Sequence, residues 1–215
     1  MVTHFPIAHE DELLGSILAR FVERQGIHED KIACHLLFGS RNIAPAVFFQ
    51  GHIAALMQQV GHIWKHSLED IAYRHTLLPI FKPFVTEASF NSLLNEIIYK
   101  DKSHVMLKSG CSAGIVAWPV TYKVCPICYH NQITTYGYAI WQRTLQCPGV
   151  EACPEHECWL INSEVDIYPE RKHKFYGPSD IKINIPTLSL IADKKSVLLS
   201  KMVYQLINTA SYLNP

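Results

Sequence analysis

The sequence predicts a mainly α-helical protein with a small zinc-binding module and a helix near its C-terminal end. Apolar residues in the first 110 positions recur every three and four residues, as they do on helices. Between 117 and 165 they alternate, and two pairs of metal-ligand residues appear. We therefore expect a helical, helix-turn-helix-like N-terminal domain at 1–116 and a zinc-binding module at 117–165. Residues 166–215 should form a linker and a helix that begins a further helical region.

Composition places the chain among globular proteins. It has 215 residues, 48% of them hydrophobic, and its 19 basic side chains balance its 19 acidic ones, which excludes disorder. No apolar run reaches the roughly 18 residues of a membrane-spanning helix, and the N-terminus turns acidic where a secretory signal would be apolar. We expect a cytoplasmic protein without a membrane partner. Seven cysteines, an odd number, argue against a disulfide framework.

Three helices are predicted before residue 61. The first carries an apolar stripe at 13–22, follows the acidic residues 10–12 and ends at Gly26. The second covers 32–37 and stops near Gly39, and the third covers 52–60 between two glycines. Glycine is the residue that most readily ends a helix, because it adopts positive φ without strain.

Two more helices are predicted before the module. Ser67 begins a Ser-Leu-Glu-Asp capping pattern, in which a hydroxyl accepts a hydrogen bond from a free backbone N–H group, and that helix should stop before Pro79. Thr86 begins another, with Phe90 and Ile97 on its buried face. Helices of this length with short connections are compatible with a helix-turn-helix motif. A plain helical bundle is the alternative that periodicity leaves open.

The module begins with a predicted strand from Trp118 to Val124, and its metal ligands follow in two pairs. Cys125-Pro-Ile-Cys128 and Cys153-Pro-Glu-His156 are separated by 24 residues. This spacing lets two turns close a tetrahedron around one Zn²⁺ ion. Four protein ligands leave no open position for an activated water, so the zinc should be structural.

The remaining cysteines leave alternatives open. Cys147 and Cys158 lie near the second pair, and either could replace one of its members as a ligand. The paired spacing favours Cys153 and His156, which makes Cys147 and Cys158 packed thiols. Cys34 and Cys111 are isolated in the sequence, and isolated cysteines are most often small buried apolar residues.

Enzyme motifs are missing from the sequence. It contains no phosphate-binding loop, no dinucleotide fingerprint, no nucleophile elbow and no metalloprotease helix. The expectation is a protein that is not an enzyme.

Several short motifs in this order resemble the TnsD/TniQ family. In the module they are Cys125–Cys128, Tyr136-Gly137, Trp141-Gln142-Arg143, Gln146, Pro148-Gly149-Val150 and Cys153–His156. In the helical part they are Phe5-Pro6, Glu12-Leu13, Ser16–Arg20, His75–Pro79 and Pro83-Phe84. The resemblance covers about residues 5 to 165, and the zinc pattern combined with the tryptophan–arginine segment is its most specific part.

The resemblance implies a target-selection protein of a DNA transposition system, associated with the bacterial nucleoid. Members of the family choose the insertion site and recruit an AAA+ regulator ATPase of the TnsC type. TnsD proteins read an attachment sequence in double-stranded DNA, whereas TniQ relatives bridge to an RNA-guided effector complex. TnsD proteins are also longer, so we expect either an N-terminal fragment or a short TniQ-like member.

Charge suggests where DNA contacts would lie. Residues 1–99 carry 7 basic and 10 acidic side chains, net −3, and residues 100–215 carry 12 and 9, net +3. A basic surface of this size permits nucleic-acid binding but is also common on ordinary protein surfaces. The candidates for phosphate contact are Lys102, Lys108, Lys123 and Arg143.

For Arg143 we hold a second interpretation, in which it stabilises the zinc module by stacking or by pairing with a carboxylate. Trp141 and Tyr136 are expected in the core of that module.

Overall fold

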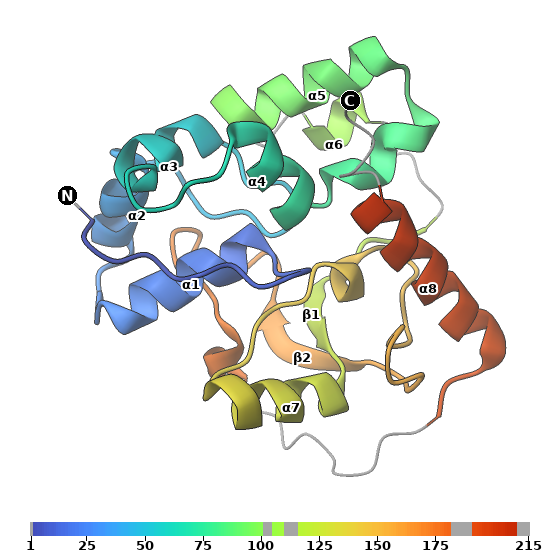
Figure 1. Cartoon of the computed structure of the whole chain (residues 1–215). Helices are drawn as coiled ribbons and strands as arrows, with labels where there is room; N and C mark the ends of the chain where they lie inside the picture. The colour runs from blue at the N-terminus through green and yellow to red at the C-terminus, as the bar shows by residue number, and fades with distance from the viewer. Residues whose placement is uncertain (1, 101–104, 110–115, 182–190, 210–215) are drawn as a thin grey trace.

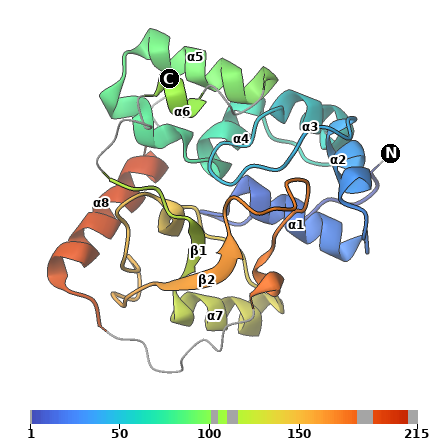
Figure 2. The ribbon, with the colours of Figure 1, turned by 180° about the vertical axis from the view of Figure 1, so that it is seen from behind.

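The computed structural model describes residues 2–100, 105–109, 116–181 and 191–209. It shows a mainly helical chain with a small sheet. In Figures 1 and 2, α2 to α6 form one layer, and α1 lies between that layer and the two-stranded sheet with α7. Helix α8 runs along one side of the molecule.

The helical elements of the N-terminal part are those that the sequence predicted, together with two short ones that it did not. They are α1 (Leu14–Arg24), α2 (Asp30–Phe38), α3 (Ile53–Val60), α4 (Leu68–His75), the 3-10 helix η1 (Leu78–Phe84), α5 (Glu87–Tyr99) and α6 (Val105–Lys108). The unpredicted elements are η1 and α6. Prolines at 79 and 83 explain why η1 is a short 3-10 segment rather than a continuation of α4.

Local chemistry sets the helix ends where the sequence predicted them. Gly39 ends α2 in the left-handed conformation with φ of 68°. The Ser67 hydroxyl accepts a 3.0 Å hydrogen bond from the Asp70 amide at the start of α4, and Thr86 accepts one from the Ser89 amide at the start of α5. Both hydroxyls satisfy N–H groups that the helix itself leaves without partners.

The module is built differently from the expectation. Its elements are β1 (Thr121–Val124), α7 (Pro126–Tyr136), the 3-10 helix η4 (Thr144–Gln146) and β2 (Ile161–Asp166), followed by the 3-10 helix η5 (Pro178–Asp180). Strands β1 and β2 are antiparallel, with Lys123 opposite Asn162. The predicted strand starts at Thr121 rather than Trp118, and neither α7 nor β2 was predicted.

Helix α8 (Lys194–Thr209) confirms the predicted C-terminal helix. Its buried residues are Val197, Ser200 and Ile207. Leu198 lies on the opposite, solvent-facing side and is 60% exposed. The serine hydroxyl can be buried because it donates to the Val197 carbonyl at 2.8 Å.

One hydrophobic core joins the helical layer, the module and α8. Leu18 of α1 and two residues of the helical layer, Leu56 and Ile97, belong to one buried cluster. The same cluster contains Trp141 from the module and Ile207 from α8. A second, smaller cluster surrounds the cysteines of the module. No helix in the described part of the chain has both the length and the apolar character needed to cross a membrane.

Candidate metal centre

The first ligand pair lies at the N-terminus of α7. Cys125 is the N-cap residue, and Pro126 occupies the first helical position, where its missing N–H group costs nothing. The Cys128 amide donates to the Cys125 sulfur at 3.4 Å. The helix start therefore presents two sulfur atoms on the same side.

The second pair lies in a tight turn before β2. The His156 amide donates to the Cys153 sulfur at 3.3 Å, in the same arrangement as in the first pair. The Cys153 amide donates to the Cys158 carbonyl at 2.8 Å, and Glu157 has a positive φ of 52°. This reversal of the chain directs both ligand side chains towards α7.

The four predicted ligand side chains form one cluster. The three cysteine sulfurs and one ring nitrogen of His156 all lie within 4.8 Å of one another, and the cysteines are buried. Nδ1 of His156 is 3.6, 3.2 and 3.6 Å from the sulfurs of Cys125, Cys128 and Cys153. Zinc–sulfur bonds of about 2.3 Å in a tetrahedron place two sulfurs about 3.8 Å apart, and Cys128 and Cys153 are separated by 3.8 Å. The cluster could therefore hold a metal ion.

Thiol ionisation in this cluster favours a bound cation. Hydrogen bonds from Cys125 and Cys128 lower the pKa of Cys153. The pKa of Cys128 is raised, first by its hydrogen bond with Cys125 and then by Cys153 and burial. Neighbouring thiolates repel one another, so one of the three ionises most readily. A divalent cation would remove that repulsion and stabilise all three thiolates.

The structure separates the alternative cysteine ligands. The sulfur of Cys158 is 3.5 Å from that of Cys125, beside the four-atom cluster but not part of it. Cys147 is fully buried, and its sulfur contacts the Arg143 carbonyl at 3.8 Å. Burial raises the pKa of Cys147, and it raises that of Cys34 to about 11. Both are packed thiols, whereas Cys111 lies outside the described residues.

Two of the predicted phosphate-contacting side chains are buried. Lys123 is 7% exposed and donates to the Val150 carbonyl at 2.9 Å while pairing with Glu151. Arg143 is 1% exposed. The structure does not support phosphate contacts for this pair, because their charged groups bond inside the protein. Lys108 is partly exposed and lies 2.7 Å from Glu96, and Lys102 lies outside the described residues.

Arg143 instead joins four segments of the fold. Its Nε pairs with Asp11 at 3.3 Å, and Nη1 donates to the carbonyls of Tyr73 and Thr76 at the end of α4. Nη2 donates to the Asn208 side chain of α8 at 2.7 Å. Burial raises the pKa of Asp11, and the Arg143 guanidinium opposes that rise. Pairing with a carboxylate is thus the interpretation that the structure supports.

A second buried ion pair, between Glu12 and Arg20, lies in the N-terminal part. This pair was not predicted from the sequence. Both oxygens of Glu12 accept from Arg20, at 2.9 and 2.7 Å, and Ser16 donates to the same carboxylate at 2.8 Å. The Trp141 amide donates to Ser16 and its carbonyl accepts from Leu13. The family-motif residues of the helical part therefore contact those of the module. The charged residues within the motifs, Glu12 and Arg20, were the sequence signal that could have indicated this ion pair.

The two aromatic residues of the module differ in their surroundings. Trp141 is fully buried, stacks on Tyr122 with ring centroids 4.1 Å apart and donates from its indole to the Tyr176 carbonyl. Its predicted core position is confirmed. Tyr136 is 47% exposed and packs near His9, so its predicted core position is wrong. It lies in the last turn of α7, which the sequence had not revealed as a helix.

Comparison with known proteins adds a family relationship. The family model described as TniQ matches residues 4–160, which include both ligand pairs and both buried arginines. The transposon Tn7 transposition protein TnsD of Escherichia coli is 26% identical over 190 residues. That alignment covers 87% of this chain and 37% of the Escherichia coli protein.

Proposed function

Because the chain belongs to the TniQ family, we propose that it selects target sites in a Tn7-like DNA transposition system. The observation that carries this proposal is the family match over residues 4–160. The chain spans 37% of the length of the TnsD protein that it matches. Binding of attachment-site DNA and recruitment of an AAA+ regulator ATPase are therefore part of the proposal.

We propose Zn²⁺ as the ion of the metal centre, with Cys125, Cys128, Cys153 and His156 as its ligands. Three thiols and one imidazole at tetrahedral spacing are a donor set that zinc prefers. The ion would crosslink the start of α7 to the turn before β2. Four protein ligands leave no position for substrate, so the centre would act by stabilising the fold rather than by catalysis.

DNA contact is proposed near the ends of α5 and α6, through a helix-turn-helix surface in the helical layer. Lys108 remains a candidate there because its side chain is 46% exposed, and Lys102 is the neighbouring candidate in the sequence. Phosphate contacts position a protein on DNA, while base contacts specify its sequence.

The test is fluorescence anisotropy of this chain on a genomic attachment-site duplex and on a scrambled duplex, at two salt concentrations. Tighter binding to the attachment site is expected for a target reader. Lys108→Ala should reduce the slope of log affinity against log salt by about 0.9, as expected for one lost phosphate contact. Lys201→Ala is the matched control, because Lys201 is also about half exposed and also pairs with a glutamate.

A second candidate function is a protein adaptor that links an RNA-guided effector complex to the ATPase. The net charge of −3 in residues 1–99 favours protein contact over DNA contact in that half. Weak and equal binding to both duplexes in the same experiment would favour the adaptor. No binding to either duplex would contradict the DNA-reading proposal, and binding with an unchanged slope for Lys108→Ala would contradict the proposed phosphate contact.

A further inference from the structure

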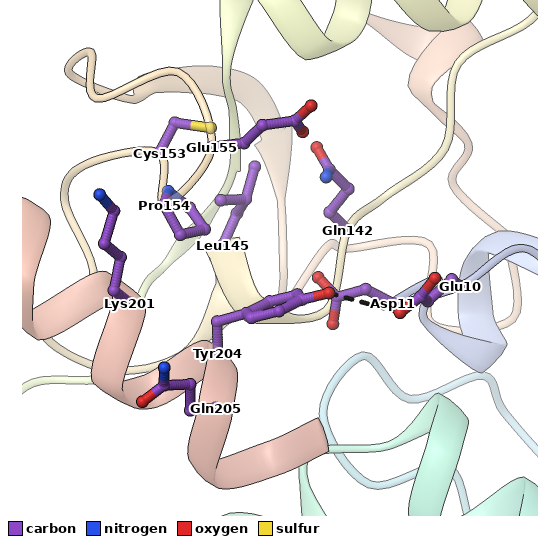
Figure 3. Close-up of a pocket in the computed structure, with 10 residues that line it drawn as sticks. All are labelled: Glu10, Asp11, Gln142, Leu145, Cys153, Pro154, Glu155, Lys201, Tyr204 and Gln205. Carbon is purple, nitrogen blue, oxygen red and sulfur yellow. Dashed lines mark hydrogen bonds between the residues drawn. The ribbon is translucent and has the colours of Figure 1, made fainter. Parts of the chain in front are cut away.

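A groove opens between the N-terminal segment, the metal module and α8 (Figure 3). Its volume is about 470 Å³. Glu10 lines it from the N-terminal segment, Leu145 and Glu155 from the module, and Lys201 and Tyr204 from α8. These residues are far apart in the sequence, so the groove exists only when the three segments are assembled.

The groove carries negative charge without compensation. Among the described residues, neither Glu10 nor Glu155 forms an ion pair, and both are exposed. The cations nearby are already engaged, because Lys201 pairs with Glu157 and Arg143 pairs with Asp11. Two carboxylates therefore face the opening, and no cation among the described residues forms an ion pair with them. A phosphate backbone would be repelled from this face.

The wall between the carboxylates combines apolar and amide side chains. Pro154 and Gln142 line it on the module side, and Gln205 lines it from α8. The Tyr204 ring extends from α8 towards the N-terminal segment, and its hydroxyl donates to Glu10 at 3.4 Å (Figure 3). A tyrosine ring and a proline with carboxylates on either side match an arginine or lysine side chain, whose methylene stem packs on the ring while its charge reaches the acids.

We propose that this groove binds an arginine- or lysine-containing segment of a protein partner. The cationic head lies between Glu10 and Glu155, and its stem packs on Pro154 and the Tyr204 ring. The proposal rests on the proposed function only in taking a protein as the occupant. It does not depend on DNA binding, so failure of the duplex experiment leaves it standing.

The test uses the full chain and a fluorescein-labelled peptide that alternates leucine and arginine. A second peptide replaces each arginine with citrulline, which keeps the shape and removes the charge, and a third replaces it with glutamate. Binding is measured by anisotropy for the unaltered chain, Glu10→Gln, Glu155→Gln and the double variant. Glu164→Gln is the matched control, because Glu164 is an exposed carboxylate on β2 that does not line the groove.

The arginine peptide should bind, and the citrulline peptide should bind at least about fivefold more weakly. Each glutamine variant should weaken the arginine peptide by about threefold to fivefold, with the double variant weaker still and Glu164→Gln unchanged. Circular dichroism confirms that each variant is folded. The proposal is overturned if the arginine peptide shows no saturation up to about 1 mM, or if the double variant and Glu164→Gln bind it equally.

Discussion

Arg143 shows how one side chain joins segments that lie far apart in the sequence. Its guanidinium contacts Asp11, the end of α4 and α8, while its backbone amide donates to the Asp11 carbonyl. A buried arginine of this kind is stable only while every donor keeps a partner. Its role is to position the module against the helical layer.

Replacing Arg143 with methionine should therefore lower the free energy of unfolding by about 3–5 kcal/mol. The substitution leaves the Asp11 carboxylate buried without its cation. Asp11→Asn in the same chain should recover part of the loss, because it removes the uncompensated charge. Urea denaturation of the single and double variants measures both effects.

The matched control is Arg171→Met, which breaks the exposed pair between Arg171 and Asp30. Exposed ion pairs contribute about 0–1 kcal/mol. Equal losses for Arg143→Met and Arg171→Met would contradict the role assigned to Arg143.

His75 makes stability depend on pH. It is 5% exposed, its Nδ1–H donates to the Glu12 carbonyl at 2.8 Å, and burial lowers its pKa from 6.5 to about 4. The unfolded chain therefore binds a proton between these two pH values that the folded chain does not. The contribution of neutral His75 to the free energy of unfolding is fully present above pH 6.5. It is lost as pH falls towards 4, by about 3 kcal/mol in total.

His75→Asn should flatten this part of the pH profile, because an asparagine amide can replace the Nδ1–H donor without titrating. The measurement is denaturation at several pH values between 4.5 and 7.5. The unfolding free energy of the unaltered chain, measured relative to that of His75→Asn, should decrease as pH falls. A difference that stays constant with pH would show that His75 does not titrate as described.

At the scale of elements, the metal centre connects a helix start to a turn. Each pair presents its ligands because a backbone amide donates to the first cysteine of the pair. The local geometry of each pair is thus encoded within four residues. The approach of one pair to the other depends on the β1–β2 ladder. Val124, the residue directly before Cys125, pairs there with Ile161 at the start of β2.

Cys125→Ser should lower stability by about 3 kcal/mol or more and reduce the zinc content well below one ion per chain. Metal-binding free energy is also folding free energy at such a centre. Calorimetry together with metal analysis of freshly purified protein measures both quantities.

Cys34→Ser is the control, because Cys34 is also fully buried but lies in α2, outside the cluster. It should keep its zinc and melt well above the Cys125 variant. Equal melting temperatures, or no metal in the unaltered chain, would refute the ligand assignment.

At the scale of the whole molecule, the three predicted divisions share one core. Ile207 of α8 is fully buried in the same cluster as Trp141 and the helical layer. Ile207→Ala should therefore cost about 2–5 kcal/mol, whereas Leu198→Ala on the exposed face of α8 should cost less than about 0.5 kcal/mol. Thermal unfolding of both variants measures the difference. Separate transitions for α8 and the remainder would contradict a shared core.

Much of the architecture could be predicted from local patterns. The predicted C-terminal end of α2 and the predicted start of α4 agree with the structure, because Gly39 and Ser67 cap these helix ends locally. Strand β2 was missed, although Ser163 and Val165 are buried alternately along it. A serine at a buried position obscures the alternation, and such a strand becomes visible only through its pairing with β1.

The sequence by itself determined the helices, their caps, the two ligand pairs and the family motifs, because each depends on residues a few positions apart. Only the tertiary structure decided which charged residues are buried. Arg143 and Lys123 have the sequence signature of surface cations, yet partners from 27 to 132 positions away surround them. Burial of a charge depends on partners brought together by folding, and spacing along the chain does not record them.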